Sequence, residues 1–509
     1  MSIKSFLTKK SLGILLHPSS LPGGTQSGTF GIEAKVWIEK LSNYGINYWQ
    51  FLPLTPTDST GSPYSSPSSF ALNPWFLDIN ELIEKRFVFI SKEEELETKN
   101  QNQNQNNYFD FDLAENLSRK IGEHLFNAWE YQSEQRKKDF FKWIKNNYWV
   151  EDYSIFMVLR EEFNMLPWWQ WPIQFKEGNI EFLNPWIEKN KEAILIKKLI
   201  QWHLDNQWKT IREFAKCNGI KLIGDLPFYV SRDSVDVWKN KKLFSVSQNG
   251  DLIFQSGVPP DYFSSTGQLW GTPTYFWSKH KSENFDWWRR RFKRQFELVD
   301  LLRLDHFRAL SEYWRVEGNA KTAINGKWIN SPGRRILNML KKDLKADYLP
   351  IIAEDLGVIT AEVEKLRENF ELPGMKILQF AFDGNPDNPY LPHNIKGENW
   401  VVYTGTHDNS TSKSWWECLD KNVKTKLNDD YKLFNNPSWD LMEIGMKTKA
   451  NLFIAPIQDI LSLDDSCRLN KPGTIKNNWR WKLNKPLEDI EEKLKDFSEL
   501  GKSCGRISD

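Results

Sequence analysis

"VDLLRLD", residues Val299–Asp305, is a short apolar run that ends in charged side chains. Seven other stretches share this character: Ser11–His17 "SLGILLH", Ile46–Pro53 "INYWQFLP", Ile220–Asp225 "IKLIGD", Leu349–Glu354 "LPIIAE", Met375–Phe382 "MKILQFAF", Trp400–Thr406 "WVVYTGT" and Asn451–Pro456 "NLFIAP". Their apolar residues are mostly consecutive rather than alternating, as strands covered on both faces require. We therefore predict eight buried strands.

Helical patterns lie between several of these strands. Ser331 and Pro332 offer an N-cap and a first-turn proline, and apolar residues at helical spacing continue to Leu344. Thr360 opens a similar pattern that extends to Phe370. Strands alternating with helices favour an α/β fold of the (β/α)8 TIM barrel type, in which the chemistry sits at the C-terminal ends of the strands.

The spacing of the strands predicts one catalytic barrel domain, residues 1–509, with two insertions. Residues 77–216 follow the second strand, contain amphipathic stretches such as Asp152–Glu162, and are expected to form a mainly helical subdomain. Within them "KNQNQNQNN", Lys99–Asn107, is expected to be a solvated loop. Residues 227–297 contain "SGVPPDYFSSTGQLWGTP", Ser256–Pro273, whose Gly and Pro content predicts a long ordered loop that binds substrate.

The balance of charge argues against some classes of partner. The chain has 68 Lys and Arg against 67 Asp and Glu, so it has no global attraction to nucleic acid or to an anionic membrane. No apolar run approaches the roughly 18 residues of a membrane span. The N-terminal run "LGILL" is too short for a secretory signal, and four widely spaced cysteines suit a reducing compartment, so a cytoplasmic location is expected.

Arg303 and Asp305 stand two residues apart on one predicted strand, so both side chains can point into the mouth of the barrel. A guanidinium beside a carboxylate favours the ionised form and lowers the carboxyl pKa. This suits Asp305 to be a nucleophile or a permanently charged stabiliser. A structural ion pair that closes the barrel is the alternative.

Four acids end four of the predicted strands: Asp225, Asp305, Glu354 and Asp408. Glu354 follows an apolar run, and apolar surroundings near another carboxylate push a carboxyl towards the neutral form that a general acid needs. Asp355 is expected to face the other way and to cap the following turn. Two carboxyls in complementary protonation states are what cleavage of a glycosidic bond with retention requires.

A metal-dependent barrel is a competing interpretation, because His306, His407 and the strand-end acids could be ligands. None of the seven histidines is paired at HxH or HExxH spacing, which argues against a metal bound by the protein. The chain also lacks GxGxxG after a strand, GxxxxGK[ST] and GxSxG. No metal and no organic cofactor are expected.

Many motifs in order resemble one family almost from end to end, the 4-α-glucanotransferases, also called amylomaltases or disproportionating enzymes, of glycoside hydrolase family 77. The motifs are "GILLHPSSLPGG", "GTFG", "WQFLPLTPT", "SPYSSPSSFALNPWFLDI", "GDLPFYVSRDSVDVW", "GVPPDYFSSTGQLWG", "LLRLDHFRAL", "IIAEDLGVIT", "GMKILQFAF", "YTGTHDN", "IAPIQDIL", "RLNKPGT" and "NWRW".

The resemblance implies a role for each matching residue. Asp305 resembles the nucleophile, Glu354 the general acid/base, and Asp408 the residue that binds sugar hydroxyls and stabilises the oxocarbenium-like transition state. The implied substrate-binding residues are Tyr64, Asp225, Gln268, Trp270, Arg303, His306 and His407, with Asp261 a weaker candidate. The implied reaction transfers part of an α-1,4-glucan donor to a glucan or glucose acceptor, by a retaining double displacement without metal or organic cofactor.

Some residues depart from the common family pattern. Ser410 and Thr411 follow "THDN" where Asp is frequent at the first position, and Thr272 and Thr274 replace residues that are often Asn and Leu. These changes bear on product size and acceptor preference. An α-glucan hydrolase would need the same carboxylates, and a non-catalytic glucan-binding protein on a barrel is a more distant alternative. Arg308 is expected to be structural.

Overall fold

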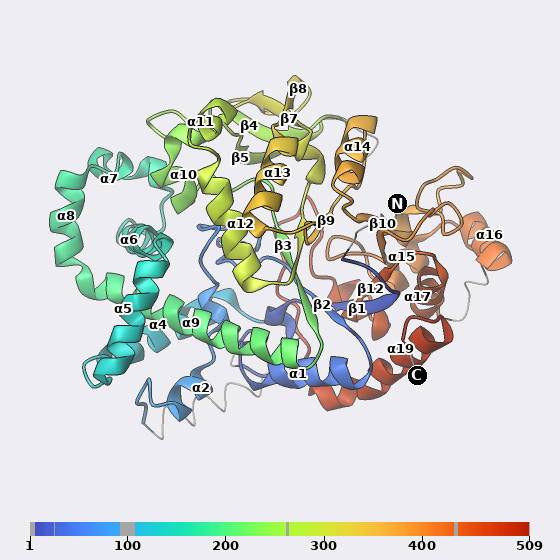
Figure 1. The fold of residues 1–509 in the computed structure, drawn as a ribbon, viewed down its shortest axis with the longest axis horizontal. Coiled ribbons are helices and arrows are strands. Elements are labelled where there is room, and N and C mark those ends of the chain that lie inside the picture. The colour runs from blue at the N-terminus through green and yellow to red at the C-terminus, as the bar shows by residue number, and fades with distance from the viewer. Residues whose placement is uncertain (1–5, 25, 92–106, 261–263, 432–435, 508–509) are drawn as a thin grey trace.

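The computed structural model describes residues 6–24, 26–91, 107–260, 264–431 and 436–507. Asp261 and nearly all of the polar segment Lys99–Asn107 lie outside these described residues. Figure 1 shows a central barrel with helices around it, and further helices extending to one side.

The barrel is one sheet of eight parallel strands in the order β10-β11-β12-β1-β2-β3-β6-β9. All eight predicted strands are present. Their bounds are β1 (Ser11–Leu15), β2 (Tyr48–Gln50), β3 (Lys221–Leu226), β6 (Leu301–Leu304), β9 (Ile351–Ala353), β10 (Gly374–Ile377), β11 (Trp400–Tyr403) and β12 (Leu452–Pro456). The prediction of a (β/α)8 TIM barrel is confirmed.

The seam between β9 and β10 closes the barrel with few hydrogen bonds. The Ala353 N–H donates to Pro373 O at 2.8 Å, and the Met375 N–H donates to the Asp355 carboxylate, also at 2.8 Å. Arg367 lies 3.2 Å from the other Asp355 oxygen. Asp355 therefore does not cap the turn that follows it, as the sequence suggested; its buried carboxylate joins the two strands at the seam.

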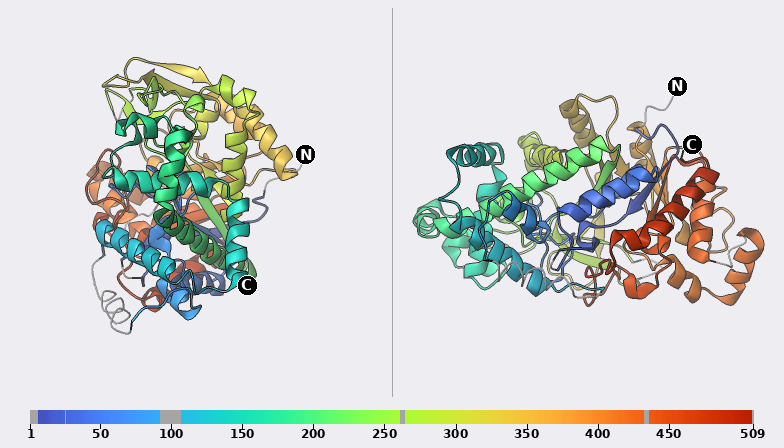
Figure 2. Two further views of the ribbon diagram at one scale, coloured as in Figure 1. Left: turned by 90° about the vertical axis from the view of Figure 1, so that its left-hand side faces the viewer. Right: turned by 90° about the horizontal axis from the view of Figure 1, so that it is seen from below.

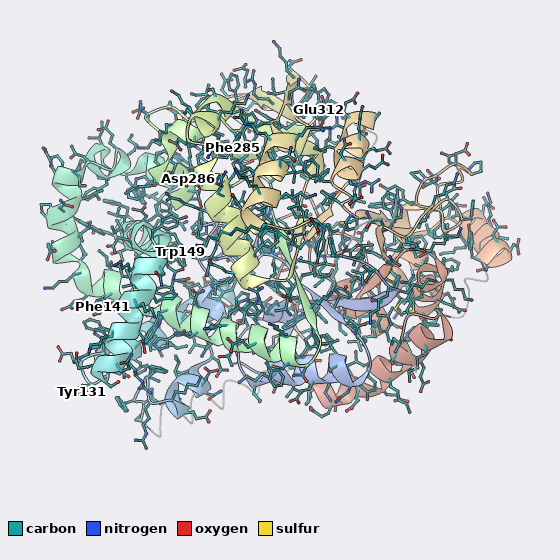
Figure 3. The ribbon with its side chains drawn as sticks, viewed as in Figure 1. Tyr131, Phe141, Trp149, Phe285, Asp286 and Glu312 are labelled. Atoms are coloured by element: carbon teal, nitrogen blue, oxygen red, sulfur yellow. The ribbon has the colours of Figure 1, made fainter. Side chains whose placement is uncertain are left out.

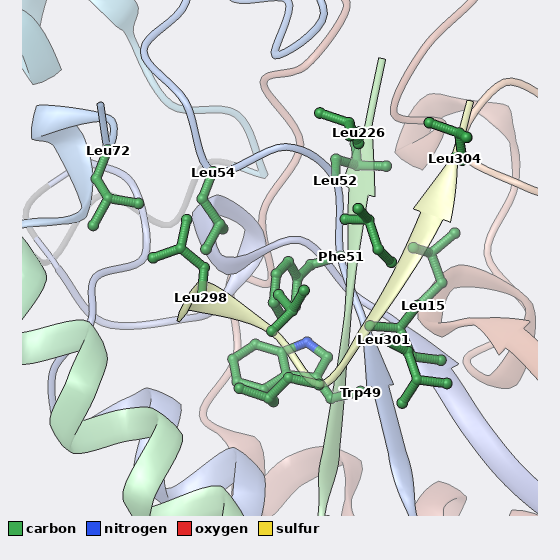
Figure 4. Packing of buried hydrophobic residues seen from close by; sticks show 14 of the residues in the cluster. Leu15, Trp49, Phe51, Leu52, Leu54, Leu72, Leu226, Leu298, Leu301 and Leu304 are labelled. Atoms are coloured by element: carbon green, nitrogen blue, oxygen red, sulfur yellow. The ribbon is translucent and has the colours of Figure 1, made fainter. Parts of the chain in front are cut away.

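Large apolar side chains fill the space around the barrel strands (Figure 4). Trp49 and Phe51, from β2 and the residue after it, are fully buried, as is Leu304 at the end of β6. The Trp49 indole N–H donates to Leu16 O at 2.7 Å, so this buried indole keeps its hydrogen bond. Consecutive apolar residues in these strands are explained by burial on both faces of the sheet.

Helices cover the outside of the barrel. In the right-hand view of Figure 2, α9, α1 and α19 lie side by side along one flank. The predicted helices after residues 332 and 360 are α13 and α14. The helices that follow the barrel strands are α1 (Ile32–Asn43), α12 (Asp286–Leu298), α13 (Gly333–Leu344), α14 (Ala361–Asn369), α15 (Ser412–Cys418), α16 (Lys421–Tyr431), α17 (Pro437–Lys447), α18 (Ile457–Ile460) and α19 (Glu491–Ser503).

The described residues between β2 and β3 are mainly helical. Its helices are α2 (Ile79–Glu84), α4 (Phe111–Asn127), α5 (Glu134–Asn146), α6 (Trp149–Glu162), α7 (Ile173–Lys176), α8 (Ile180–Lys189) and α9 (Lys191–Cys217). Two buried glutamines of α9 hold the preceding loop: Gln201 makes two hydrogen bonds to the backbone of Leu72, at 2.9 and 2.7 Å, and Gln207 makes two to that of Asp78, both at 2.9 Å.

A second sheet lies beside the barrel, and we call it the side sheet. It is antiparallel, in the order β5-β4-β7-β8, with β4 (Phe254–Val258), β5 (Gln268–Pro273), β7 (Glu312–Glu317) and β8 (Gly326–Asn330). Glu312, labelled in Figure 3, begins β7. The short helices α10 (Val235–Lys239) and α11 (Trp277–Ser282) flank β4 and β5 in the chain.

The side sheet corrects one sequence prediction, because strands β4 and β5 occupy both ends of the segment expected to be a loop. Glycine is needed in β4: a Cβ on Gly257 would lie 2.2 Å from Gln268 O on β5. The close approach of two backbones therefore explains a glycine that the sequence alone attributes to a loop. Among the described residues, no helix is long and apolar enough to cross a membrane.

Candidate active site

The predicted acids lie at the C-terminal ends of barrel strands. Asp225 is within β3, Asp305 and Glu354 directly follow β6 and β9, and Asp408 follows β11. Backbone hydrogen bonds tie neighbouring strand ends together: the Asp305 N–H donates to Leu226 O at 3.0 Å, and the Glu354 N–H donates to Leu304 O at 3.1 Å. The two central carboxyl groups thus start from positions that the barrel itself holds.

Arg303 binds two carboxylates at once. Its Nη1 lies 3.0 Å from Asp305 Oδ1, and 2.8 and 2.7 Å from the two oxygens of Asp225. The register of β3 and β6 places Asp225 directly opposite Arg303. The pairing of Arg303 with Asp305 was predicted, whereas the closer contact with Asp225 was not.

The charges in this group influence each other strongly because they are buried. Asp225 and Arg303 are only 3% and 5% exposed. Burial raises the pKa of the Asp225 carboxyl, Arg303 opposes that rise, and the charge of Asp305 adds to it. The pKa of Arg303 is raised well above its usual range, because attraction to Asp225 and Asp305 outweighs the effect of its burial. Arg303 is therefore a permanent cation between two acids.

Glu354 has the properties of an acid that is protonated at neutral pH. Burial, and next the negative charge of Asp305, raise its pKa to about 8, against the opposing effect of Arg303. Its Oε2 accepts a hydrogen bond from the His306 N–H at 2.7 Å, and its Oε1 accepts one from the Leu356 N–H at 3.0 Å. His306 reaches this position with a left-handed backbone, φ 52°.

Tyr64 connects Asp225 to a group of stacked rings. Its hydroxyl donates to Asp225 Oδ2 at 2.8 Å, and its ring stacks on His407 with the centroids 5.3 Å apart. Trp479 lies 5.9 Å from both rings, measured between centroids. Trp479 belongs to the motif "NWRW", but sequence reasoning did not single it out.

Asp408 is in a more open environment than the other acids, because 46% of its side chain is exposed. Its Oδ1 lies 3.3 Å from His407 Nε2 and accepts a hydrogen bond from Asn470 Nδ2 at 2.6 Å. Arg468 Nη2 donates to the Asp408 carbonyl at 2.5 Å. Arg468 and Asn470 belong to the motif "RLNKPGT", and no role was predicted for either residue.

The side sheet brings Gln268 and Trp270 to the same rim. The Trp270 ring meets His306 edge to face, with centroids 5.0 Å apart, and Gln268 Oε1 accepts a hydrogen bond from Trp270 Nε1 at 3.3 Å. Burial lowers the pKa of His306 to about 4, so this ring is neutral at physiological pH. Its buried Nε2 has no hydrogen-bond partner among the described residues.

The predicted site residues thus form two groups that touch. Gln268, Trp270 and His306 make up the smaller, on the side-sheet side, and the backbone of His306 joins it to Glu354. The larger group comprises Tyr64, Asp225, Arg303, Asp305, Glu354, His407 and Asp408. In the part of the chain that the structure describes, no three His, Cys, Asp or Glu side chains are grouped to hold a metal ion.

A barrel with buried and exposed carboxyls at its strand ends has the architecture of an enzyme acting on glycosidic bonds. The sequence model of glycoside hydrolase family 77, described as 4-alpha-glucanotransferase, matches residues 16–488. The chain therefore belongs to this family and is an enzyme of the 4-α-glucanotransferase class.

Comparison with individual proteins also finds members of this family. A 4-alpha-glucanotransferase of Synechocystis sp. is 39% identical over 94% of this chain and 94% of its own length. One from Thermus thermophilus is 37% identical over 93% and 95%, respectively. Among solved structures, the amylomaltase of Streptococcus agalactiae in complex with acarbose is 33% identical, has a TM-score of 0.92, and is matched over 98% of this chain and 100% of its own.

Proposed function

We propose that this enzyme transfers a segment of an α-1,4-glucan to the 4-hydroxyl of an acceptor glucan or glucose by a retaining double displacement. Asp305 attacks C1 of the donor sugar and forms a glucosyl–enzyme bond, while Glu354 gives its proton to the departing glycosidic oxygen. The acceptor 4-hydroxyl then attacks the same carbon as Glu354 removes its proton. Two inversions at C1 preserve the α configuration.

The placement of Glu354 at the strand end next to an arginine-bound Asp305 is the single observation that carries this proposal. Arg303 Nη1 lies 3.0 Å from Asp305 Oδ1, so the carboxylate that attacks C1 is held in place beside a cation. Burial and the charge of Asp305 keep the proton on Glu354, with a pKa of about 8, as an acid needs. The two roles follow from one shared electrostatic environment.

The same charges explain how Glu354 can change from acid to base. The negative charge of Asp305 contributes to the raised pKa of Glu354. When Asp305 forms an ester with the sugar, that charge disappears, and the pKa of Glu354 falls. Glu354 is then a better base for the acceptor hydroxyl.

The remaining residues of the rim are assigned to binding. Asp408 and His407 bind sugar hydroxyls, and Asp408 stabilises the positive charge that develops at the sugar ring. Tyr64, Asp225 and Arg303 hold the donor sugar at the cleavage point together with His306. Trp270 and Gln268 extend this surface towards the side sheet, where their partly exposed side chains suit an acceptor sugar.

Asp305→Asn and Glu354→Gln test the catalytic roles. Asp305→Asn should abolish turnover while glucan binding persists, and near-normal activity would contradict the assignment of the nucleophile. Glu354→Gln should still form a covalent adduct on Asp305 from a glucosyl fluoride, whose leaving group needs little protonation. Intact-protein mass spectrometry measures the adduct, and its absence would count against these roles.

Incubation with maltotriose tests transfer against hydrolysis. Transfer yields glucose and longer maltooligosaccharides at constant reducing-end concentration, whereas hydrolysis increases the reducing ends.

We also propose that the enzyme acts in the cytoplasm, because its four cysteines are all unpaired, as in a reducing compartment.

A further inference from the structure

Arg308 makes contacts that connect three parts of the active-site rim. It lies in the 3-10 helix Phe307–Leu310, three residues after Asp305, and is 7% exposed. Its Nη1 donates to Val358 O, four residues after Glu354. Its Nη2 donates to Glu312 Oε1 at 2.7 Å, and its guanidinium lies 3.8 Å from the centre of the Trp328 ring.

These contacts come from separate elements. Glu312 begins β7 (Figure 3), and Trp328 is in β8 of the side sheet. Val358 belongs to the segment that follows β9, and the residue is 75% exposed. Its carbonyl is therefore held by Arg308 although its side chain faces solvent.

The segment from Glu354 to Val358 is consequently fixed at both ends. At the start, the Glu354 carboxylate accepts hydrogen bonds from His306 and Leu356, and at the end, Arg308 holds Val358. Both His306 and Arg308 belong to the stretch that carries Asp305. Gly357, between the two anchors, has φ +82°, a backbone conformation that residues other than glycine rarely adopt.

We propose that Arg308 is a positioning residue that keeps the Glu354 segment closed against Asp305, so that Glu354 stays half-buried beside Asp305. This inference rests on the proposed role of Glu354 as the acid. A planar guanidinium can stack on Trp328 while donating in two directions, which a lysine ammonium cannot do. Without Arg308, the segment loosens at Val358 and more water reaches Glu354, so the pKa of Glu354 falls towards that of an ordinary glutamate.

Two donors separate this role from a merely structural one. For maltotriose, whose leaving oxygen needs a proton, Arg308→Met should lower kcat/KM about 10- to 100-fold, as misplaced catalytic groups do. For a glucosyl fluoride, it should lower kcat/KM less than about 3-fold, because formation of the adduct needs little acid assistance. The basic limb of the maltotriose pH profile should move down by about one pH unit, and Arg308→Lys should recover part of the loss.

Arg315→Met is the matched control. Arg315 lies on β7 of the same sheet, 3.9 Å over the Phe254 ring, but it contacts neither catalytic segment in the described structure. It should leave both donors and the pH profile unchanged. Equal losses with both donors in Arg308→Met, or an Arg308→Met enzyme that behaves like Arg315→Met, would overturn the inference.

Two further variants keep the test decisive. If Arg308→Met does not fold, Trp328→Leu serves instead, because it removes the ring under the guanidinium but keeps Arg308. It should shift the ratio of kcat/KM for the two donors, and the basic limb of the maltotriose pH profile, in the same direction by smaller amounts. Unchanged values overturn the inference. Glu354→Gln is measured in parallel. If Glu354→Gln cleaves maltotriose normally, the proposed acid role of Glu354 is wrong. If Glu354→Gln is inactive on maltotriose but Arg308→Met keeps the parent ratio of kcat/KM for the two donors, only the proposed role of Arg308 is wrong.

Discussion

The barrel rim and the side sheet meet at one active site but are built from different kinds of sequence. The barrel strands are buried on both faces, and hydrogen-bonded neighbours hold Asp225, Arg303, Asp305 and Glu354 near their ends. The side sheet is antiparallel and partly exposed, and its edge strand carries Gln268 and Trp270. Under the proposed mechanism, bond cleavage falls to the hydrogen-bonded rim, whereas contact with the acceptor falls to the more exposed sheet.

The largest expected effect follows from breaking the rim at Arg303. Arg303→Met leaves Asp225 without its cation in a buried site, which typically costs about 3–5 kcal/mol of stability. Asp305 also loses the cation that lies 3.0 Å from its carboxylate. Turnover should fall at least about 1,000-fold, which corresponds to a loss of ~4 kcal/mol of transition-state stabilisation. Initial rates with maltotriose and urea unfolding measure the two effects.

Arg294→Met provides the matched control, because Arg294 makes a comparable buried ion pair, 2.6 Å from Asp205, away from the rim. It should lower stability by a similar amount but leave kcat within about 3-fold of the parent enzyme. If both variants lose activity equally, the loss reflects unfolding, and the distinction between rim and remainder is wrong.

Glu354→Gln should stabilise the protein increasingly as pH rises. The pKa of Glu354 in the folded protein is about 8, above the 4.5 of an unperturbed glutamate. Between pH 4.5 and 8, the folded state therefore keeps a proton that the unfolded state has released. The free energy of unfolding of the parent protein therefore falls as pH rises through this window, whereas that of the glutamine variant does not. Above pH 8 the two should differ by up to a few kcal/mol. Thermal unfolding from pH 4 to 9 measures it, and a pH-independent difference would contradict the burial of the acid.

Trp270→Ala should affect the acceptor more than the donor. Loss of the ring removes a platform beside His306, worth about 1–2 kcal/mol, so transfer between maltotriose molecules should slow roughly 5- to 30-fold while cleavage of a glucosyl fluoride changes less. The increase in reducing ends relative to glucose release measures the shift towards hydrolysis. Trp439→Leu, on the outer helix α17, is the control and should leave this ratio unchanged.

Gln207→Leu should have the smallest effect on catalysis. It removes both hydrogen bonds to the Asp78 backbone and leaves a buried N–H and C=O unpaired, which costs about 2–4 kcal/mol in total. The free energy of unfolding should fall, whereas kcat for the remaining folded enzyme should stay within about 2-fold. A large fall in kcat without a stability change would mean that the helical region contributes directly to the site.

The sequence was a good guide to the barrel because its strands are encoded by burial. Apolar runs ended by acids, such as the run ending in Asp305, mark strands whose two faces are covered and whose ends are polar. The same logic failed for β4 and β5, because an antiparallel strand with Gly257 at a close backbone approach reads as a loop. Local composition cannot show that two backbones pass within contact distance.

Long-range partners were also beyond local patterns. The contact of Arg303 with Asp225 depends on strand order and register, which join residues 78 positions apart. Trp479 and Asn470 reach the rim from the long segment between β12 and α19, well beyond the end of the strand, so strand-end position did not identify them. The departures Thr272 and Thr274 were expected to bear on the acceptor. The Thr272 hydroxyl pairs with Ser256 between β5 and β4, and the Thr274 hydroxyl, directly after β5, pairs with Ser245. Ser410 instead lies at the rim, where its hydroxyl accepts a hydrogen bond from Arg468 at 2.9 Å.

The position of β1 between β2 and β12 has a consequence for biosynthesis. One edge of β1 pairs with β2, which follows within a few tens of residues, but the other pairs with Leu452–Pro456 near the far end of the chain. At about 5–20 residues per second, roughly 20–90 s of translation separate β1 from the strand that covers it. During that time β1 has one unpaired strand edge, so the barrel can close only after Leu452–Pro456 has been synthesised.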